Sequence, residues 1–210
     1  MKIAHKIYSK VDQDLFAEFS GDFNDLHVNE IEARRKIHGK CVVHGVNVFL
    51  WAWTELSKFT NKIQSRFIVN FLQPIFLDTK LILYYDKFNN TLQIKNKSET
   101  LIVIKFIEKS IEIPKGIEFI KPQKNLSSAR KLSFENIVEG KIQNFRIRGK
   151  PSLAKKLFPY LIKRYSEQLV VEIASLSQIV GMECPGEHST FVSLLYEIKK
   201  NNDSPNYYVH

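Results

Sequence analysis

Apolar residues recur at two different spacings along the chain, and each spacing predicts a different element. Residues 1–11 alternate weakly between apolar and polar, as in an entering strand. Residues 44–59 instead carry apolar side chains around most of a helical circumference, which predicts a helix buried on nearly all sides. Between them, residues 12–20 predict a short helix, with Asp12 as its N-cap, Gly21 as its end, and one apolar face made by Leu15, Phe16 and Phe19.

Four later segments are typical of strands, with alternating or β-branched and aromatic residues. They are residues 65–76, 80–88, 91–97 and 101–109. Pro74 favours an edge strand or a bulge for the first of them, because proline cannot donate to a sheet ladder. Asn89-Asn90 predicts a tight turn between the second and the third. One buried helix wrapped by antiparallel strands predicts an α+β unit over residues 1–112.

The second half repeats this order in a shorter form. Residues 113–150 have little pattern and predict a connector. Residues 156–186 predict a second long helix that ends at Pro185-Gly186, and residues 189–198 predict one strand after it. Because a single strand cannot cover so apolar a helix, residues 151–210 are expected to form an incomplete second unit. The uncovered helix and the open strand edge would then favour a homodimer or a higher oligomer.

Composition and charge narrow the function only slightly. The chain has 210 residues and a net charge of +9, but its lysines are spread along its length. This favours a solvated basic surface that tolerates acidic ligands, and it argues against nucleic-acid binding. The longest apolar run, residues 46–53, is too short to span a membrane. No signal peptide is expected, and two isolated cysteines, Cys41 and Cys184, are expected in the core of a reduced, cytoplasmic protein.

Residues that carry chemistry gather in one short stretch, GDFNDLH. It places Gly21, Asp22, Asn24 and His27 in one turn, and VVHG follows at residues 42–45. Taken singly, an aspartate here is most often a turn residue, and a lone histidine is most often a surface or core residue. Together, at the mouth of a strongly apolar helix, they predict a functional site. Since no histidine or cysteine pair has the spacing of metal ligands, no metal and no other cofactor are expected.

The run SGDFNDLH followed by VVHG resembles the hydratase motif of MaoC-like dehydratases, the hot-dog-fold enzymes that include R-specific enoyl-CoA hydratases. Two longer segments, residues 33–52 and 175–195, are similar to proteins in which two hot-dog units precede a short-chain reductase. The resemblance implies a hot-dog fold with one complete unit and a second, incomplete one. The second half lacks the motif, so one active site per chain is expected.

The resemblance also implies a reaction and roles for the motif residues. Enzymes of this kind add water to 2-enoyl thioesters of coenzyme A or an acyl carrier protein, or remove it from 3-hydroxyacyl thioesters. Asp22 and His27 would hold the water and exchange protons, while the backbone N–H of Gly45 would stabilise the thioester oxyanion. Asn24 would brace the turn, and it is grouped with Val43 and His44 as a candidate substrate-binding residue.

The motif departs from the family pattern at two positions, because Asp25 replaces a proline and Asn29 replaces an acidic residue. If its carboxylate points inward, Asp25 would raise the pKa of Asp22. Two other functions stay open beside the hydro-lyase. One is a hot-dog thioesterase, and the other is a module that binds acyl thioesters without catalysis.

Overall fold

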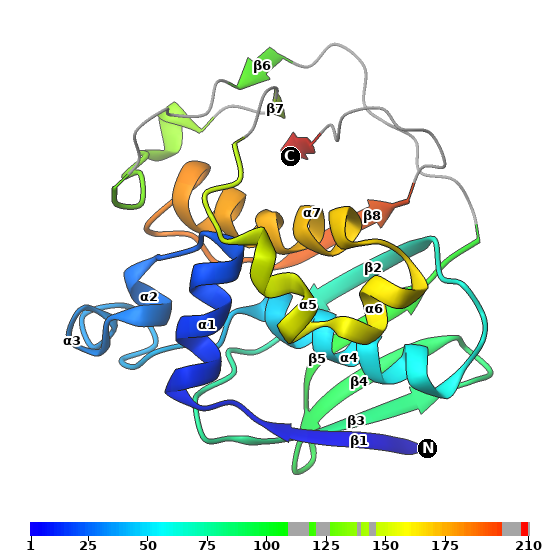
Figure 1. Ribbon diagram of the computed structural model, residues 1–210. Coiled ribbons are helices and arrows are strands. Elements are labelled where there is room, and N and C mark those ends of the chain that lie inside the picture. The colour runs from blue at the N-terminus through cyan, green and yellow to red at the C-terminus, as the bar shows by residue number, and fades with distance from the viewer. Residues whose placement is uncertain (109–117, 121–126, 138–139, 143–145, 199–206, 210) are drawn as a thin grey trace.

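One antiparallel sheet forms the base of the molecule, and the central helix lies along one of its faces (Figure 1). The computed structural model describes residues 1–108, 118–120, 127–137, 140–142, 146–198 and 207–209. Within these residues the sheet has six strands, each antiparallel to its neighbours. Their order is β1 (Lys2–Ile7), β3 (Lys80–Asp86), β4 (Thr91–Asn96), β5 (Glu99–Phe106), β2 (Arg66–Phe71) and β8 (Ser193–Glu197).

The core lies between this sheet and the central helix α4 (Gly45–Phe59). Every residue of α4 from Val46 to Thr54 is buried, as the apolar pattern predicts. Alternate strand residues face the helix, because side chains in a strand point to opposite faces of the sheet. A helix wrapped by an antiparallel sheet is the hot-dog arrangement, so the predicted α+β fold class is confirmed. The inward residues include Phe67, Val69, Leu81, Leu83, Leu92, Ile94, Ile102 and Ile104.

The first helix, α1 (Lys10–Ser20), begins three residues earlier than the sequence predicts. Its N-cap is Ser9, and Asp12 is the third helical residue of a capping box: Ser9 accepts from the amide of Asp12, and the carboxylate of Asp12 accepts from the amide of Ser9. Placing the N-cap at Asp12 was therefore wrong. Gly21 ends the helix as predicted, and two short helices follow, α2 (Asp25–Val28) and α3 (Glu30–Ala33).

The second half contains several short helices where one long helix was predicted. They are η2 (Pro151–Leu153), α5 (Ala154–Leu157), α6 (Pro159–Arg164), α7 (Glu167–Gln178) and the π-helical turn η3 (Ile179–Glu183). Pro159 starts α6 because proline fits the first turn of a helix but not its interior. Ser166 caps α7 through a hydrogen bond from the amide of Leu169, so the chain makes a new helix start there.

The apolar face of α7 is covered, which corrects the expectation of an exposed helix. Val170 and Ile173 are fully buried, and α7 contacts both α1 and α4. The strand that follows, β8, does not start a sheet of its own but pairs with β2 and extends the first sheet. Strand β2 therefore pairs with β5 on one side and β8 on the other, so the predicted edge was wrong. Pro74 does not interrupt this pairing, because β2 ends at Phe71.

The predicted connector, residues 113–150, lies partly outside the described residues. Within it, β6 (Glu118–Ile120) and β7 (Gly140–Ile142) form a small sheet with β9 (Tyr207–Val209), and η1 covers Phe134–Asn136. Residues 146–150 pack on the end of α1, where the amide of Lys150 donates to the carbonyl of Glu18. The division of the chain at residues 112 and 150 stays a prediction. None of the helices in the described part is both long and apolar enough to cross a membrane.

Candidate functional site

The turn that follows α1 depends on Gly21. Its φ of +79° is a left-handed conformation that favours glycine, and its amide donates to the carbonyl of Ala17 at 2.9 Å to close the helix. A Cβ at this position would also lie 2.6 Å from Oε1 of Gln178 and 2.8 Å from the amide of Gly149. Gly21 therefore lets the chain reverse in a crowded place and turns Asp22 toward the interior.

Asn24 braces the turn, as expected. Its Oδ1 accepts from the amide of Leu26 at 3.0 Å and caps α2, while its Nδ2 donates to the carbonyl of Gly181 at 2.7 Å. The carbonyls near the end of a helix have no intrahelical partner, so Gly181 is free to accept this bond. Because the residue is 2 % exposed and both ends of its side-chain amide are hydrogen-bonded, Asn24 stabilises the turn and its contact with the helical turn that contains Gly181. Its contact with a substrate stays a prediction.

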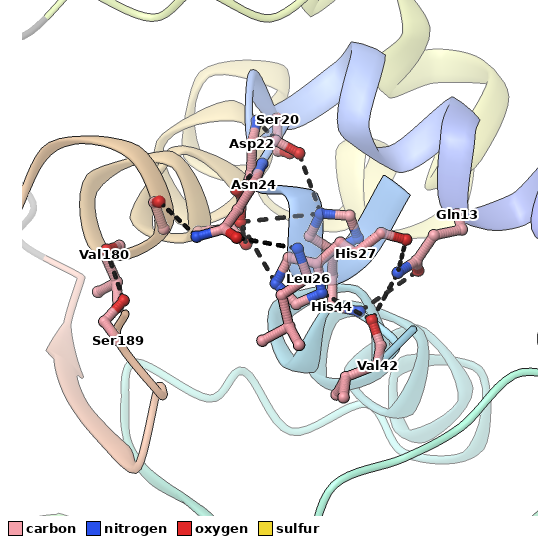
Figure 2. A network of polar contacts seen from close by, with 12 residues as sticks. Gln13, Ser20, Asp22, Asn24, Leu26, His27, Val42, His44, Val180 and Ser189 are labelled. Carbon is pink, nitrogen blue, oxygen red and sulfur yellow. Dashed lines mark hydrogen bonds and ion pairs between the residues drawn. The ribbon is translucent and has the colours of Figure 1, made fainter. Parts of the chain in front are cut away.

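His27, on α2, is held through one ring nitrogen and offers the other to Asp22 (Figure 2). Its Nδ1 lies 2.6 Å from the carbonyl oxygen of Val42, which can only accept, so Nδ1 carries the proton. The same carbonyl accepts from Nε2 of Gln13 at 2.6 Å. In neutral His27 the Nε2 lone pair is therefore available, and this atom lies 3.8 Å from Oδ2 of Asp22.

His44 closes the cluster from the start of α4. Its Nε2 lies 3.1 Å from the backbone carbonyl oxygen of Asp22 and 3.7 Å from the Oδ2 of the same residue. Its ring stacks on that of His27, with the centroids 3.9 Å apart and the planes 27° apart. Figure 2 shows both imidazoles beside Asp22, with dashed lines that mark their contacts with it. Residues that lie 22 positions apart in sequence thus meet in one buried cluster.

Burial controls the ionisation of Asp22. The residue is 1 % exposed, and desolvation raises the pKa of its carboxyl group above the ordinary value. Three contacts oppose this by stabilising the charged form: His27, the hydroxyl of Ser177 at 2.6 Å from Oδ2, and the amide of Asn24 at 3.2 Å from Oδ1. The carboxylate is thus poorly solvated but well supplied with donors, an environment suited to proton exchange.

Three residues of the site were missed at the sequence level: Gln13, Ser177 and Gly181. Ser177 and Gly181 belong to α7 and its π-helical extension, and they contact Asp22 and Asn24 across more than 150 positions of sequence. A Cβ on Gly181 would lie 2.5 Å from Oδ1 of Asp22, so only glycine fits against the carboxylate. The sequence did offer one signal for them, because Ser177 and Gly181 are small residues four positions apart and so lie on one helical face. Both also fall in the segment 175–195, which resembles the double-hot-dog proteins.

Gly45 begins α4, and its N–H has no partner within the helix because it belongs to the first turn. The positive end of the helix dipole favours a developing oxyanion there. The ring of Phe71 covers the Cα of Gly45, and an added Cβ would lie 2.7 Å from it. Val43, 2 % exposed, donates its amide to the carbonyl of Ile75 at 2.7 Å and so fixes the approach to the helix. Substrate contacts of Gly45 and Val43 stay predictions.

The departure at Asp25 has little effect on the site. Its Oδ1 accepts from Nδ2 of Asn29 at 3.3 Å, within α2 and its cap. Asp25 is not among the groups that shift the pKa of Asp22. The two residues that depart from the motif therefore pair with each other. Cys41 and Cys184 are both buried, as expected for small core residues.

Asp22, His27 and His44 bring their ligand atoms within 4.8 Å of one another, although their sequence spacing predicts no metal site. By distance alone, these three ligand atoms could bind one metal ion. Two histidines that bind one ion direct their ring planes at it from different sides, whereas these two rings lie nearly parallel and in contact. His44 also directs Nε2 at a carbonyl oxygen. The arrangement suits proton transfer better than coordination, and we assign no metal to it.

Comparison with known proteins gave matches among solved structures alone. No protein-family model matches the chain, and no curated protein sequence matches it. A MaoC-like dehydratase from Phytophthora capsici is 12% identical, with a TM-score of 0.47, over 90% of this chain and 77% of that one.

Two shorter proteins match half of the chain. An (R)-hydratase from A. caviae involved in PHA biosynthesis is 19% identical, with a TM-score of 0.39, over 50% of this chain and 92% of that one. An R-hydratase from Pseudomonas aeruginosa is 17% identical, with a TM-score of 0.37, over 55% and 88%. The chain is thus similar to MaoC-like dehydratases and R-hydratases, the proteins that its motif resembles, at identities that leave activity to be argued from the site.

Proposed function

We propose that the protein is a hydro-lyase that adds water to 2-enoyl thioesters and removes it from 3-hydroxyacyl thioesters. The observation that carries the proposal is the buried pair of Asp22 and His27, with Oδ2 and Nε2 3.8 Å apart beside the amino end of an apolar helix. A carboxylate and an imidazole at this separation can share one water molecule. The acyl carrier would be coenzyme A or an acyl carrier protein, either of which suits a basic chain.

The pair has what the proton transfers require. Addition of water forms a bond from its oxygen to C3 and delivers a proton to C2, so one proton leaves the water and one reaches C2. The free Nε2 of His27 and the carboxyl group of Asp22 each can hold one proton. One group takes the proton from water while the other gives one to C2. The pair therefore ends with as many protons as it began with, and no other reactant is needed.

The negative charge that develops on the thioester oxygen needs a fixed donor. The amide of Gly45 is the candidate, because it is unpaired within the helix and lies next to His44, which contacts both members of the pair. The ring of Phe71 lies against the Cα of Gly45 and would give the acyl group an apolar neighbour.

The test follows the loss of the conjugated thioester absorbance when the protein is mixed with a short trans-2-enoyl-CoA. We expect turnover by the wild type and a loss of about a hundred- to ten-thousand-fold in Asp22→Asn and in His27→Ala, with binding nearly intact. Asp25→Asn is the matched control, since this carboxylate lies in the same turn but pairs with Asn29. Full activity of either site variant would refute the assignment of the pair.

The same mixtures separate the other two functions. Release of free thiol without formation of the 3-hydroxyacyl product would indicate a thioesterase. Binding of the enoyl-CoA without any turnover by the wild type would indicate a binding module. Either result would overturn the hydro-lyase proposal.

A further inference from the structure

His44 has an unusual setting for a histidine beside a candidate active site. The residue is fully buried, and its ring contacts the ring of Phe16, with the centroids 5.0 Å apart, and that of His27, with the centroids 3.9 Å apart. The ring therefore contacts both the apolar core and the proposed acid–base pair. Its role in substrate binding stays a prediction, as it does for the similarly buried Asn24.

The hydrogen bonds of His44 define its tautomer. A backbone carbonyl oxygen only accepts, so the 3.1 Å contact from Nε2 to the carbonyl of Asp22 requires a proton on Nε2. The other nitrogen, Nδ1, is buried and has no hydrogen-bond partner within the described part of the chain. A second proton on Nδ1 would be buried without an acceptor, which is costly. His44 is therefore neutral, with its proton on Nε2.

The electrostatic environment agrees with this geometry. Burial lowers the pKa of His44 well below its ordinary value of 6.5, and the neighbouring His27 lowers it further. Among the described residues, the titratable side chains that contact the His44 ring are Asp22, from the loop after α1, and His27, from α2. Gln13 of α1 faces its backbone and accepts from the amide of His44 at 3.4 Å.

The neutral ring constrains both members of the pair. His27 is anchored at Nδ1 by the carbonyl of Val42, and this bond alone would leave the ring free to tilt about it. The stacked ring of His44 removes that freedom and keeps Nε2 of His27 directed at Asp22. The bond from Nε2 of His44 to the backbone carbonyl of Asp22 fixes the backbone from which the carboxylate extends.

We infer that His44 is a positioning residue, a permanently neutral imidazole whose stacked ring and Nε2–H together set the mutual orientation of Asp22 and His27. The inference deepens the proposed function and rests on it for its kinetic consequences. Its structural part, the neutral tautomer and the stack, holds independently of any activity.

Two substitutions separate the two contacts. His44→Phe keeps a flat ring against His27 but loses the N–H, whereas His44→Gln keeps an N–H near the position of Nε2 but loses the ring. We expect kcat for hydration of trans-2-enoyl-CoA to fall about three- to tenfold in His44→Phe, the effect of one neutral hydrogen bond. In His44→Gln it should fall about a hundredfold through misplacement of His27. KM should change little in both.

His5→Phe and His5→Gln are the matched controls, because His5 is exposed on β1, and they should keep wild-type kinetics. A purely structural role of His44 would reduce the folded fraction and leave kcat per folded molecule unchanged. Wild-type kcat in both His44 variants would therefore overturn the positioning role.

A spectroscopic measurement tests the structural part without turnover and without variants. In nitrogen-15 NMR spectra of the labelled wild type, His44 should keep its Nε2–H tautomer and stay neutral well below pH 6.5. Titration of His44 at its ordinary value would overturn the inference. Absence of hydratase activity in the wild type would instead remove the proposed function, and the spectra would still decide the state of His44.

Discussion

The two halves of the chain use the same pair of elements, a buried helix followed by a strand, but to different ends. Helices α4 and α7 contact each other, and the strands that follow them, β2 and β8, pair antiparallel with Val69 opposite Leu194. The corresponding elements of the two halves therefore lie side by side. The rings of Phe67 and Tyr196, one from each strand, stack with centroids 5.4 Å apart across the junction.

The halves differ in which end of the helix meets the site. The amino end of α4 brings His44 and Gly45, whereas the carboxyl end of α7 brings Ser177 and Gly181. The first half also has three more strands after β2 in the six-stranded sheet to cover its helix, whereas the second half contributes only β8 to that sheet among the described residues. The second half therefore acts as a supporting layer for one site, and it depends on the first half for its own cover.

The largest expected effect is on stability, from Ile173→Ala at the centre of α7. This side chain is fully buried, and its removal should cost about 2–5 kcal/mol of unfolding free energy. Both tryptophans, Trp51 and Trp53, lie on α4, and the ring of Trp53 also contacts that of Tyr165 after α6, with the centroids 4.5 Å apart. Their fluorescence therefore reports on the first half and on its junction with the second. If the halves share one core, the unfolding transition followed by this fluorescence should move to a lower denaturant concentration, and the transition followed by helical circular dichroism should move with it.

Ile31→Ala is the control, because Ile31 is 66% exposed on α3, and it should leave the transition unchanged. Separate transitions, with tryptophan fluorescence unaffected by Ile173→Ala, would show that the halves unfold independently. The domain division at residues 112 and 150 would then be supported.

The next effect is on turnover, from Gly181→Ala. The new methyl group would lie 2.5 Å from Oδ1 of Asp22, so the carboxylate or the helix end must shift. A displacement of that size next to the reacting groups should lower kcat by about a hundredfold. Gln168→Ala, at an exposed position of the same helix, should keep wild-type kcat. An active Gly181→Ala enzyme would mean that α7 does not constrain Asp22 during the reaction.

Ser177→Ala should have a smaller effect with a distinctive pH dependence. Loss of the 2.6 Å hydrogen bond to a charged oxygen should lower kcat/KM by about ten- to a hundredfold. This bond lowers the pKa of Asp22, so removing it raises that pKa. The ionised fraction of Asp22 then falls at a higher pH, and the acid limb of the pH profile should move upward. Ser177→Thr should restore the wild-type limb, and an unmoved limb in Ser177→Ala would contradict the contact.

The periodicity of the sequence was enough to predict the central helix and the strands of the first half. The apolar residues of α4 and the alternation in β2 to β5 produce strong, local patterns, because each element buries a face that its own spacing defines. The motif turn was predictable for a similar reason. The contacts by which Gly21 ends α1 and Asn24 caps α2 lie within a few residues of each, whereas the bond from Asn24 to Gly181 does not.

The sequence could not show how the second half would be used. Whether β8 starts a new sheet or extends the first depends on long-range pairing with β2, which leaves no local signal. The break before α7 arises from Ser166, whose capping bond was hidden in an otherwise helical pattern. The contacts of Ser177 with Asp22 span 155 positions, so they were visible only in three dimensions.

The smallest effect on stability should come from Leu195→Lys, which tests how the second half ends. Strand β8 is an edge of the six-stranded sheet, and Leu195 is 50% exposed on it. If the dimer expected from the sequence forms through this edge, lysine there should give a monomer in light scattering, with unfolding free energy changed by less than about 0.5 kcal/mol. The opposite edge, β1, provides a matched control: Ile7 is 52% exposed, and Ile7→Lys should leave the dimer intact. Dissociation by Ile7→Lys alone would place the interface on the first half. A monomeric wild type would mean that the edge of β8 needs no partner chain. One strand would then suffice to cover the helix of the second half, where the first half uses four.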